Sequence, residues 1–404
     1  MSSSPEIPIG ERIRFYRDAK HKTQVVVAGL AGISADYLSQ IERGLKTPTI
    51  NLLHRIAKIL GVPTSTLLGE PVCDDTSRGH PSSAAMHAAL LGYRSPEEHE
   101  APPDPGDLRR RVEDAWTTWQ SSPSRYTELG RVLPDLVQDV QLPLRALRGQ
   151  DQAAHRREAF RTAAHLYFLV RSFCKRIGRM DLCLLAADRG TTAAEEADDP
   201  LLITAARWNL GHALIADNEP EGAEEVATRA VEELEPHLSD SSTVSLAMFG
   251  ALHLVAAIAA VRRGDAWTAR ERLRDKALPA ARVTGEGNVC WTVFGPTNVG
   301  MHSISVEMEA GEASEALRLA DDVDVSRLPS IERQMTFYLE LARCYDQRRE
   351  DPAVLLHLFS AERLSPEDIR YNALARDLVR GLVKRARPSY LPDVRKLAAR
   401  IGLL

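Results

Sequence analysis

Residues 31–49 of the chain read AGISADYLSQIERGLKTPT and carry the signals for a short helix between two turns. Gly32 is suited to the left-handed backbone conformation that ends a helix, and Ser34 is a typical N-cap for the next one. The new helix runs from Ala35 to about Arg43 and is closed by Gly44. These features predict two short helices joined by a tight turn.

The flanking residues extend this helical pattern over residues 9–69. Ile9, Ile13 and Tyr16 recur at a spacing that places them on one face of a preceding helix. Three further helices are expected to begin after N-cap threonines, at Thr23, Thr49 and Thr64. We therefore expect about five helices in the first 70 residues.

The segment TQVVVAGLAGISADYLSQIERGLKTPTINLLHRIAKILGVP, residues 23–63, resembles the phage-repressor (Cro/CI, or XRE) class of DNA-binding domain. The match extends without a gap from about Ile9 to Gly69. The resemblance implies that helix 35–43 enters the major groove, with Gln40 pairing to adenine and Asp36 accepting from cytosine. The DNA-contacting set that it implies is Gln24, Ser34, Ala35, Asp36, Tyr37, Ser39, Gln40, Arg43, Lys46, Thr47 and Thr49.

Other positions of the same segment have structural consequences. Arg17 and Glu42 match a family pair that ties the first helix to the recognition helix, so the resemblance implies a structural ion pair. Val25 and Val26 stand where the family usually has charged residues, and Gly29 lies inside a helix, where glycine costs about 1 kcal/mol relative to alanine. Val25 and Val26, together with Ala35 and Asp36, leave open a protein–protein adaptor, or a phosphatase or kinase modulator, whose helix-turn-helix head no longer binds DNA.

Composition divides the 404 residues into three zones. Residues 1–70 form the head, and residues 71–107 form a Pro-rich linker in which AAMHAALLGY predicts one short helix. Residues 108–404 are rich in Ala and Leu, with helical periodicity and no alternation typical of strands. The sequence therefore predicts an all-α protein.

The third zone contains a degenerate repeat. A small or apolar residue follows a polar turn at Cys183, Ala223, Ala269, Ala316 and Val354, at intervals of 40, 46, 47 and 38 residues. The turns read RIGRMD, ADNEPEG, RRGDAW, EAGEAS and QRREDP. Helix pairs at this period are typical of α-solenoids, and TAARWNLGHALIADNEPEGAEEVATRAVEELEP resembles the tetratricopeptide repeat.

A concave groove lined by the first helix of each pair is expected to bind an effector. Lys175 and Arg343 are candidates for holding a terminal carboxylate. The groove residues expected from the repeat are His165, Phe168, Lys175, Trp208, Asn209, His212, Asn298, Met301, His302 and Arg343.

A DNA-binding head joined to such repeats resembles the peptide-sensing regulators of Gram-positive bacteria. The segment DLRRRVEDAWTTWQSSPSRYTELGRVLPDLVQDV resembles even more closely a group of long actinobacterial regulators. The resemblance implies a homodimer formed through the helical domain, with double-stranded DNA as partner. It leaves open whether the effector is a peptide or a small molecule.

Bulk properties agree with a cytoplasmic regulator. Residues 1–70 hold nine Lys/Arg against six Asp/Glu, whereas the remainder holds 42 against 50, so a basic head precedes an acidic body. Five cysteines without Cys-x-x-Cys spacing indicate a reducing compartment. The apolar stretch 246–261 is expected to be a core helix and not a membrane span. No enzyme motif occurs, and we expect no catalytic site, cofactor, metal site or membrane partner.

Overall fold

The computed structural model describes residues 8–20, 22–60, 62, 64–68, 80–92, 103–146, 153–240, 242–326 and 328–404. Within these ranges every regular element is helical, which confirms the all-α prediction. The chain forms two compact units, Met1–Gly79 and His80–Leu404. Cys73 and most of the predicted linker lie outside the described residues.

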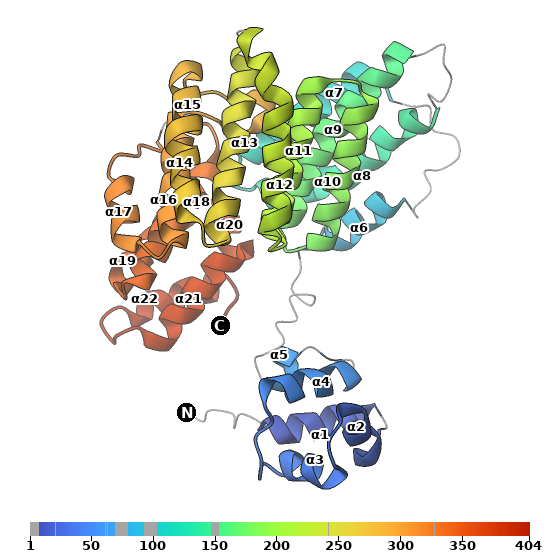
Figure 1. The fold of residues 1–404 in the computed structure, drawn as a ribbon, viewed down its shortest axis with the longest axis vertical. Coiled ribbons are helices and arrows are strands. Elements are labelled where there is room, and N and C mark those ends of the chain that lie inside the picture. Colours follow the sequence, from blue (N-terminus) through green and yellow to red (C-terminus); the bar gives the residue numbers. More distant parts are fainter. Residues whose placement is uncertain are drawn as a thin grey trace. The chain divides into compact units, whose positions relative to one another are not determined.

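The described residues of the smaller unit form five helices, as the sequence predicts. They are α1 (Ile9–Ala19), α2 (Gln24–Ala31), α3 (Ala35–Glu42), α4 (Ile50–Leu60) and α5 (Thr64–Leu68) (Figure 1). Thr23 and Ser34 cap α2 and α3 through their side chains, and Gly32 ends α2 with a φ of 69°. A small core of fully buried side chains holds the helices together: Ile13, Val27, Leu38, Ile56 and Leu67.

The larger unit is a series of packed helices that follow one another along the chain (Figure 1). The first part comprises α6 (Ser83–Leu91), α7 (Pro105–Ser121), α8 (Arg125–Ala146), α9 (Ala153–Arg176), α10 (Met180–Glu196), α11 (Pro200–Ala216) and α12 (Pro220–Leu234). The middle comprises α13 (Thr243–Arg262), α14 (Ala266–Glu271), α15 (Leu278–Thr284), α16 (Pro296–Glu309) and α17 (Ala313–Ala320). The last part comprises α18 (Ile331–Gln347), α19 (Asp351–Leu364), α20 (Pro366–Tyr371), α21 (Ala373–Arg385) and α22 (Leu391–Arg400).

The five predicted repeat turns share one backbone geometry. Each contains a residue with positive φ, at Gly178, Asn218, Gly264, Gly311 and Arg349. The next N–H donates to the carbonyl five residues earlier, at 2.8–2.9 Å in all five turns. This is the hydrogen bond of a Schellman turn, which closes a helix and redirects the chain. The repetition explains why the sequence shows polar turns at a regular interval.

The larger unit closes on itself, because its first helices contact its last ones. The guanidinium of Arg125 in α8 donates to both carboxylate oxygens of Asp368 in α20 at 2.6 Å, and both side chains are buried. In α7, the indole of Trp119 donates to Glu332 of α18 at 3.1 Å. The ring of Trp116 stacks on Trp291, with centroids 5.1 Å apart. Residues far apart in sequence therefore meet on the side of α9 and α18 where Arg176 contacts Glu332, which we call the inner face.

Two sequence features fall inside this larger unit. The short run predicted within residues 71–107 forms α6, which packs on α8. Helix α13 is apolar and long enough to cross a membrane by composition alone, yet 78% of its most apolar window is buried inside the unit. It packs against helices on several sides, as the central helix of a folded core does.

Candidate functional site

Helix α3 has one apolar face and one polar face. The hydroxyl of Ser34 accepts a hydrogen bond from the N–H of Tyr37 at 3.1 Å and so fixes the start of the helix. Leu38 and Ile41 are buried in the core of the smaller unit. Because an α-helix has about 3.6 residues per turn, the opposite face is left to polar side chains.

Side chains on the polar face of α3 form hydrogen bonds within the helix. The amide of Gln40 donates to the carboxylate of Asp36 at 2.8 Å, so Asp36 holds the side chain that the sequence assigns to base contact. Arg43 is exposed at the end of the helix, and its Nε lies 3.4 Å from the carbonyl of Ser39. Ala35 is half-buried and packs against the core.

The loop after α3 continues this polar surface. Lys46, Thr47 and Thr49 are all exposed. Thr49 also accepts a hydrogen bond from the N–H of Leu52 at 3.3 Å, which caps α4. The cations and hydroxyls of this loop are suited to phosphate oxygens, which accept hydrogen bonds and carry negative charge.

A buried ion pair joins α1 to α3. The guanidinium of Arg17 donates to the Glu42 carboxylate through Nε at 2.7 Å and Nη2 at 2.9 Å. This hydrogen bonding with Glu42 raises the pKa of Arg17. The amide of Gln24, at the start of α2, also donates to Glu42 at 2.7 Å. Glu42 therefore fixes the relative positions of three helices, and one amide N–H of Gln24 is already engaged in the protein alone.

The structure adds one contact that the sequence analysis missed, and it shows the surroundings of the two valines that the analysis singled out. Gly10 in α1 lies so close to α3 that a Cβ there would stand 2.0 Å from the carbonyl oxygen of Ile41. No local signal marks this contact, because it depends on how α1 crosses α3. Val25, Val26 and Leu30 are 70%, 48% and 63% exposed, so α2 presents an apolar surface.

The residues predicted for the effector groove separate into buried and accessible groups. Phe168 is 1% exposed and packs beside Gly190 of α10, so it belongs to the core. Asn209 and Asn298 are also 1% exposed, and Trp208 is 6% exposed. His165 is half-buried, and its carbonyl oxygen accepts a hydrogen bond from Trp116 at 2.9 Å.

His212 belongs to a cluster of side chains from α9 and α11. Arg171 of α9 donates to the amide oxygen of Asn209 in α11, and its guanidinium carbon lies 5.7 Å from the centre of the Trp208 ring. The Trp208 ring in turn contacts His212, with centroids 4.4 Å apart. Burial, together with Lys175 and Arg171, lowers the pKa of His212 well below its usual value, so the ring is neutral at pH 7.

One cation of α9 also contacts α18. Arg176 donates to the Glu332 carboxylate at 2.7 Å, across 156 residues of sequence. Burial opposes ionisation of Glu332, but Arg176 and Arg125 hold its pKa well below the usual range. Burial and the neighbouring Arg176 and Arg171 lower the pKa of Lys175 to about 7.

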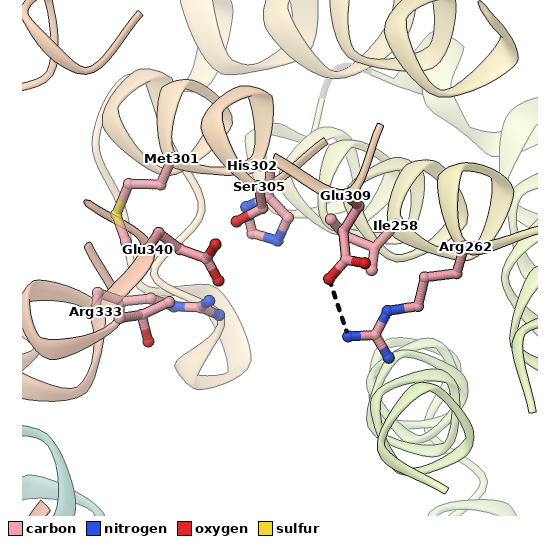
Figure 2. A pocket seen from close by; sticks show the side chains of 9 residues that line it. Ile258, Arg262, Met301, His302, Ser305, Glu309, Arg333 and Glu340 are labelled. Atoms are coloured by element: carbon pink, nitrogen blue, oxygen red, sulfur yellow. Dashed lines mark ion pairs between the residues drawn. The ribbon is translucent and has the colours of Figure 1, made fainter. Parts of the chain in front are cut away.

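A cavity of about 130 Å³ lies between α13, α16 and α18 (Figure 2). Met301 and His302, both predicted groove residues, line it, and Arg333 is at one side. Burial and Arg333 lower the pKa of His302 to about 4, and its Nδ1 lies 2.8 Å from the carbonyl oxygen of Asn298. The other lining residues are Ile258, Arg262, Ser305, Glu309, Thr336 and Glu340.

Two carboxylates that line the cavity, those of Glu309 and Glu340, form ion pairs with arginines. Arg343, a predicted groove residue, donates to Glu309 at 3.2 Å and to Glu340 at 3.1 Å. Arg262 lies 3.6 Å from Glu309 (Figure 2). Arg343 is thus engaged with carboxylates of the protein itself.

The described residues contain no group of three or more His, Cys, Asp or Glu side chains placed to hold a metal ion. Cys174, Cys183 and Cys344 are buried, and Cys290 is half-buried. Burial raises the pKa of each of these four thiols, which makes them poor nucleophiles at neutral pH.

Comparison with known proteins shows what the smaller unit is similar to. A helix-turn-helix family model matches residues 13–67. The HTH-type transcriptional regulator SinR of Bacillus licheniformis is 43% identical over 63 residues, which span 15% of this chain and 57% of SinR. The HTH-type transcriptional regulator y4dJ of Sinorhizobium fredii is 39% identical over 54 residues, 13% of this chain and 70% of y4dJ.

Among solved structures, Bacillus thuringiensis PlcR in complex with the peptide PapR7 and DNA aligns with 88% of this chain and 98% of PlcR. The sequence identity is 13% and the TM-score is 0.32, a value too low to establish a common arrangement of helices.

Proposed function

We infer the function from the premise that this chain belongs to the helix-turn-helix family of transcriptional regulators, and we propose that it binds specific DNA sequences through α3. The observation that carries the proposal is the polar outer face of α3. Gln40 and Asp36 lie on it at one helical turn, and exposed Arg43 and Lys46 flank it. A helix of this kind fits the major groove, while the flanking cations reach phosphates.

The experiment that tests this role is a gel shift on genomic fragments with two single-residue variants. Gln40→Ala removes the side chain assigned to base contact and is expected to reduce the preference for specific over random DNA about tenfold. Arg43→Ala removes a phosphate contact and is expected to weaken binding to both kinds of DNA alike, with a shallower salt dependence. Equal losses on specific and random DNA for Gln40→Ala would contradict the base-contact assignment.

We further propose that the protein acts in the cytoplasm as a homodimer formed through the helical repeat domain, residues 108–404. One chain offers one α3, and dimers of this class read two half-sites about 34 Å apart. Sedimentation of the full chain, alone and with a DNA fragment carrying two half-sites, tests this proposal. A mass of two chains per fragment is expected, whereas a single chain per fragment would rule out the dimer.

The larger unit is proposed to bind an effector, a peptide or a small molecule, that changes the affinity for DNA. The cavity between α13, α16 and α18 supports this proposal, because a ligand there would contact side chains from three helices of the unit. Such a ligand shifts DNA affinity only if it binds the two conformations of the protein with different affinity.

The apolar surface of α2 favours a second candidate, a protein–protein adaptor that no longer binds DNA. Val25 and Val26 are exposed where charged residues would assist binding to a polyanion. Replacing both valines by lysine separates the two functions. An adaptor would lose its protein partner, whereas a DNA-binding regulator is expected to keep its sequence preference and gain affinity.

A further inference from the structure

We propose that Arg171, Lys175 and Arg333 on the inner face of the larger unit bind the anionic group of a ligand, a carboxylate or a phosphate. This inference deepens the effector part of the proposed function and rests on it for the ligand's regulatory role. The binding itself is independent of whether α3 contacts DNA.

The charges of the inner face are unbalanced in the protein alone. Arg171, Lys175 and Arg176 follow one another within two turns of α9, and Arg176 donates to Glu332 of α18, the residue before Arg333. Within the described part of the chain, Arg171 donates to an amide and Arg333 to a backbone carbonyl, and neither they nor Lys175 form an ion pair with a carboxylate. Taking an unpaired charge out of water is unfavourable, so this arrangement lowers stability unless an anion joins it.

The surrounding polar groups are arranged for a ligand and not for internal pairing. Arg171 is 4% exposed, and Asn209, a neutral acceptor, takes its hydrogen bonds. Arg333 reaches one backbone carbonyl, that of Thr292, at 3.4 Å. The neutral rings of His212 and His302 lie beside these cations and offer hydrogen bonds without adding charge.

The charged side chains that line the adjoining cavity would fix the orientation of a bound ligand. Figure 2 shows Arg333 and Glu340 on one side of the cavity and Glu309, which pairs with Arg262, on the other. An acidic head group is therefore favoured at Arg333, and a ligand body with N–H or O–H donors toward the Glu309 carboxylate. Both the free carboxyl end of a short peptide and a small organic acid have this chemistry.

Thermal unfolding of the full chain without DNA tests the proposal. The probes are inorganic phosphate, citrate and tetra-alanine with a free or an amidated C-terminus, each added at constant ionic strength. A ligand that binds only the folded state raises the melting temperature saturably. We expect a rise of about 3 °C or more at about 10 mM for at least one anionic probe, and none for the amidated peptide.

The matched variants are K175M with R333M in one chain, and K396M as control, since Lys396 is exposed. The double variant removes two cations without leaving a carboxylate unpaired, so it is expected to fold. Loss of the shift in the double variant and its retention in K396M would support the site. The inference is overturned if no anion gives a saturable shift, or if the double variant keeps it. A parallel gel shift reports DNA binding separately, so the two failures are distinguishable.

Discussion

Substituting Gly10 by alanine should displace the helix that is proposed to read DNA. Gly10 is buried in the first turn of α1, and its backbone faces α3. An added Cβ would stand 2.0 Å from the Ile41 carbonyl oxygen and 2.9 Å from that of Glu42. Cβ atoms essentially never approach another heavy atom closer than 3.0 Å, so α1 and α3 must separate by roughly 1 Å.

The expected loss of stability follows from this overlap. Overpacking a well-filled core costs about 1–3 kcal/mol, and here the obstacle is backbone, which cannot rotate away. The same movement would stretch the bonds between Arg17 and Glu42. We therefore expect Gly10→Ala to lower the free energy of unfolding of the smaller unit by about 3 kcal/mol.

Gly29→Ala provides a matched control in the same unit. Gly29 is exposed within α2, and a Cβ there would meet nothing within 4 Å. Alanine has the higher helix propensity, so this variant should gain about 1 kcal/mol. Both substitutions add one methyl group to a helical glycine, and only the surroundings differ.

Native-state hydrogen exchange of the full chain measures the two effects without interference from the larger unit. Amides of α1, α3 and α4 should exchange about 100-fold faster in Gly10→Ala, and several-fold slower in Gly29→Ala. If Gly10→Ala protects these amides as well as the wild-type chain does, α1 and α3 are not in the close contact described, and the packing argument fails.

The larger unit yields two further predictions. Lys175→Met should raise the free energy of unfolding by about 2 kcal/mol at pH 6, because folding lowers the pKa of Lys175 from 10.5 to about 7 and thus disfavours its charged form. The gain is complete below pH 7 and should disappear as the pH rises toward 10.5. Urea unfolding at pH 6 and pH 10 checks it, and a gain equal at both values would contradict the charge argument. Asp368→Asn leaves Arg125, 0% exposed, without its charged partner, so we expect a loss of about 3–5 kcal/mol in the same assay. An unchanged urea midpoint for Asp368→Asn would show that the pair does not hold the two ends together.

Much of the helical framework could be predicted from sequence because helix ends are determined locally. Ser34 caps α3 with a residue three places away, and Gly178 closes α9 with hydrogen bonds that span five residues. The repeat turns were located correctly even at Arg349, where no glycine marks the left-handed residue.

The inner face was predicted less completely. The expected groove included Phe168, which a helical register alone cannot distinguish from a groove residue, since it depends on the angle at which α10 packs on α9. Arg171 and Arg333 were missed because each looks like an ordinary solvated cation in its own helix.

By itself, the sequence determined the all-α class, the caps and turns of the helices, and the polar composition of α3. Only the tertiary structure decided that Gly10 contacts α3 and that Arg176 of α9 pairs with Glu332 of α18. The physical reason is the separation along the chain of the residues that make each contact. Caps and turns are made by hydrogen bonds within a few residues of chain, whereas these contacts join helices whose separation depends on how all the intervening pairs pack.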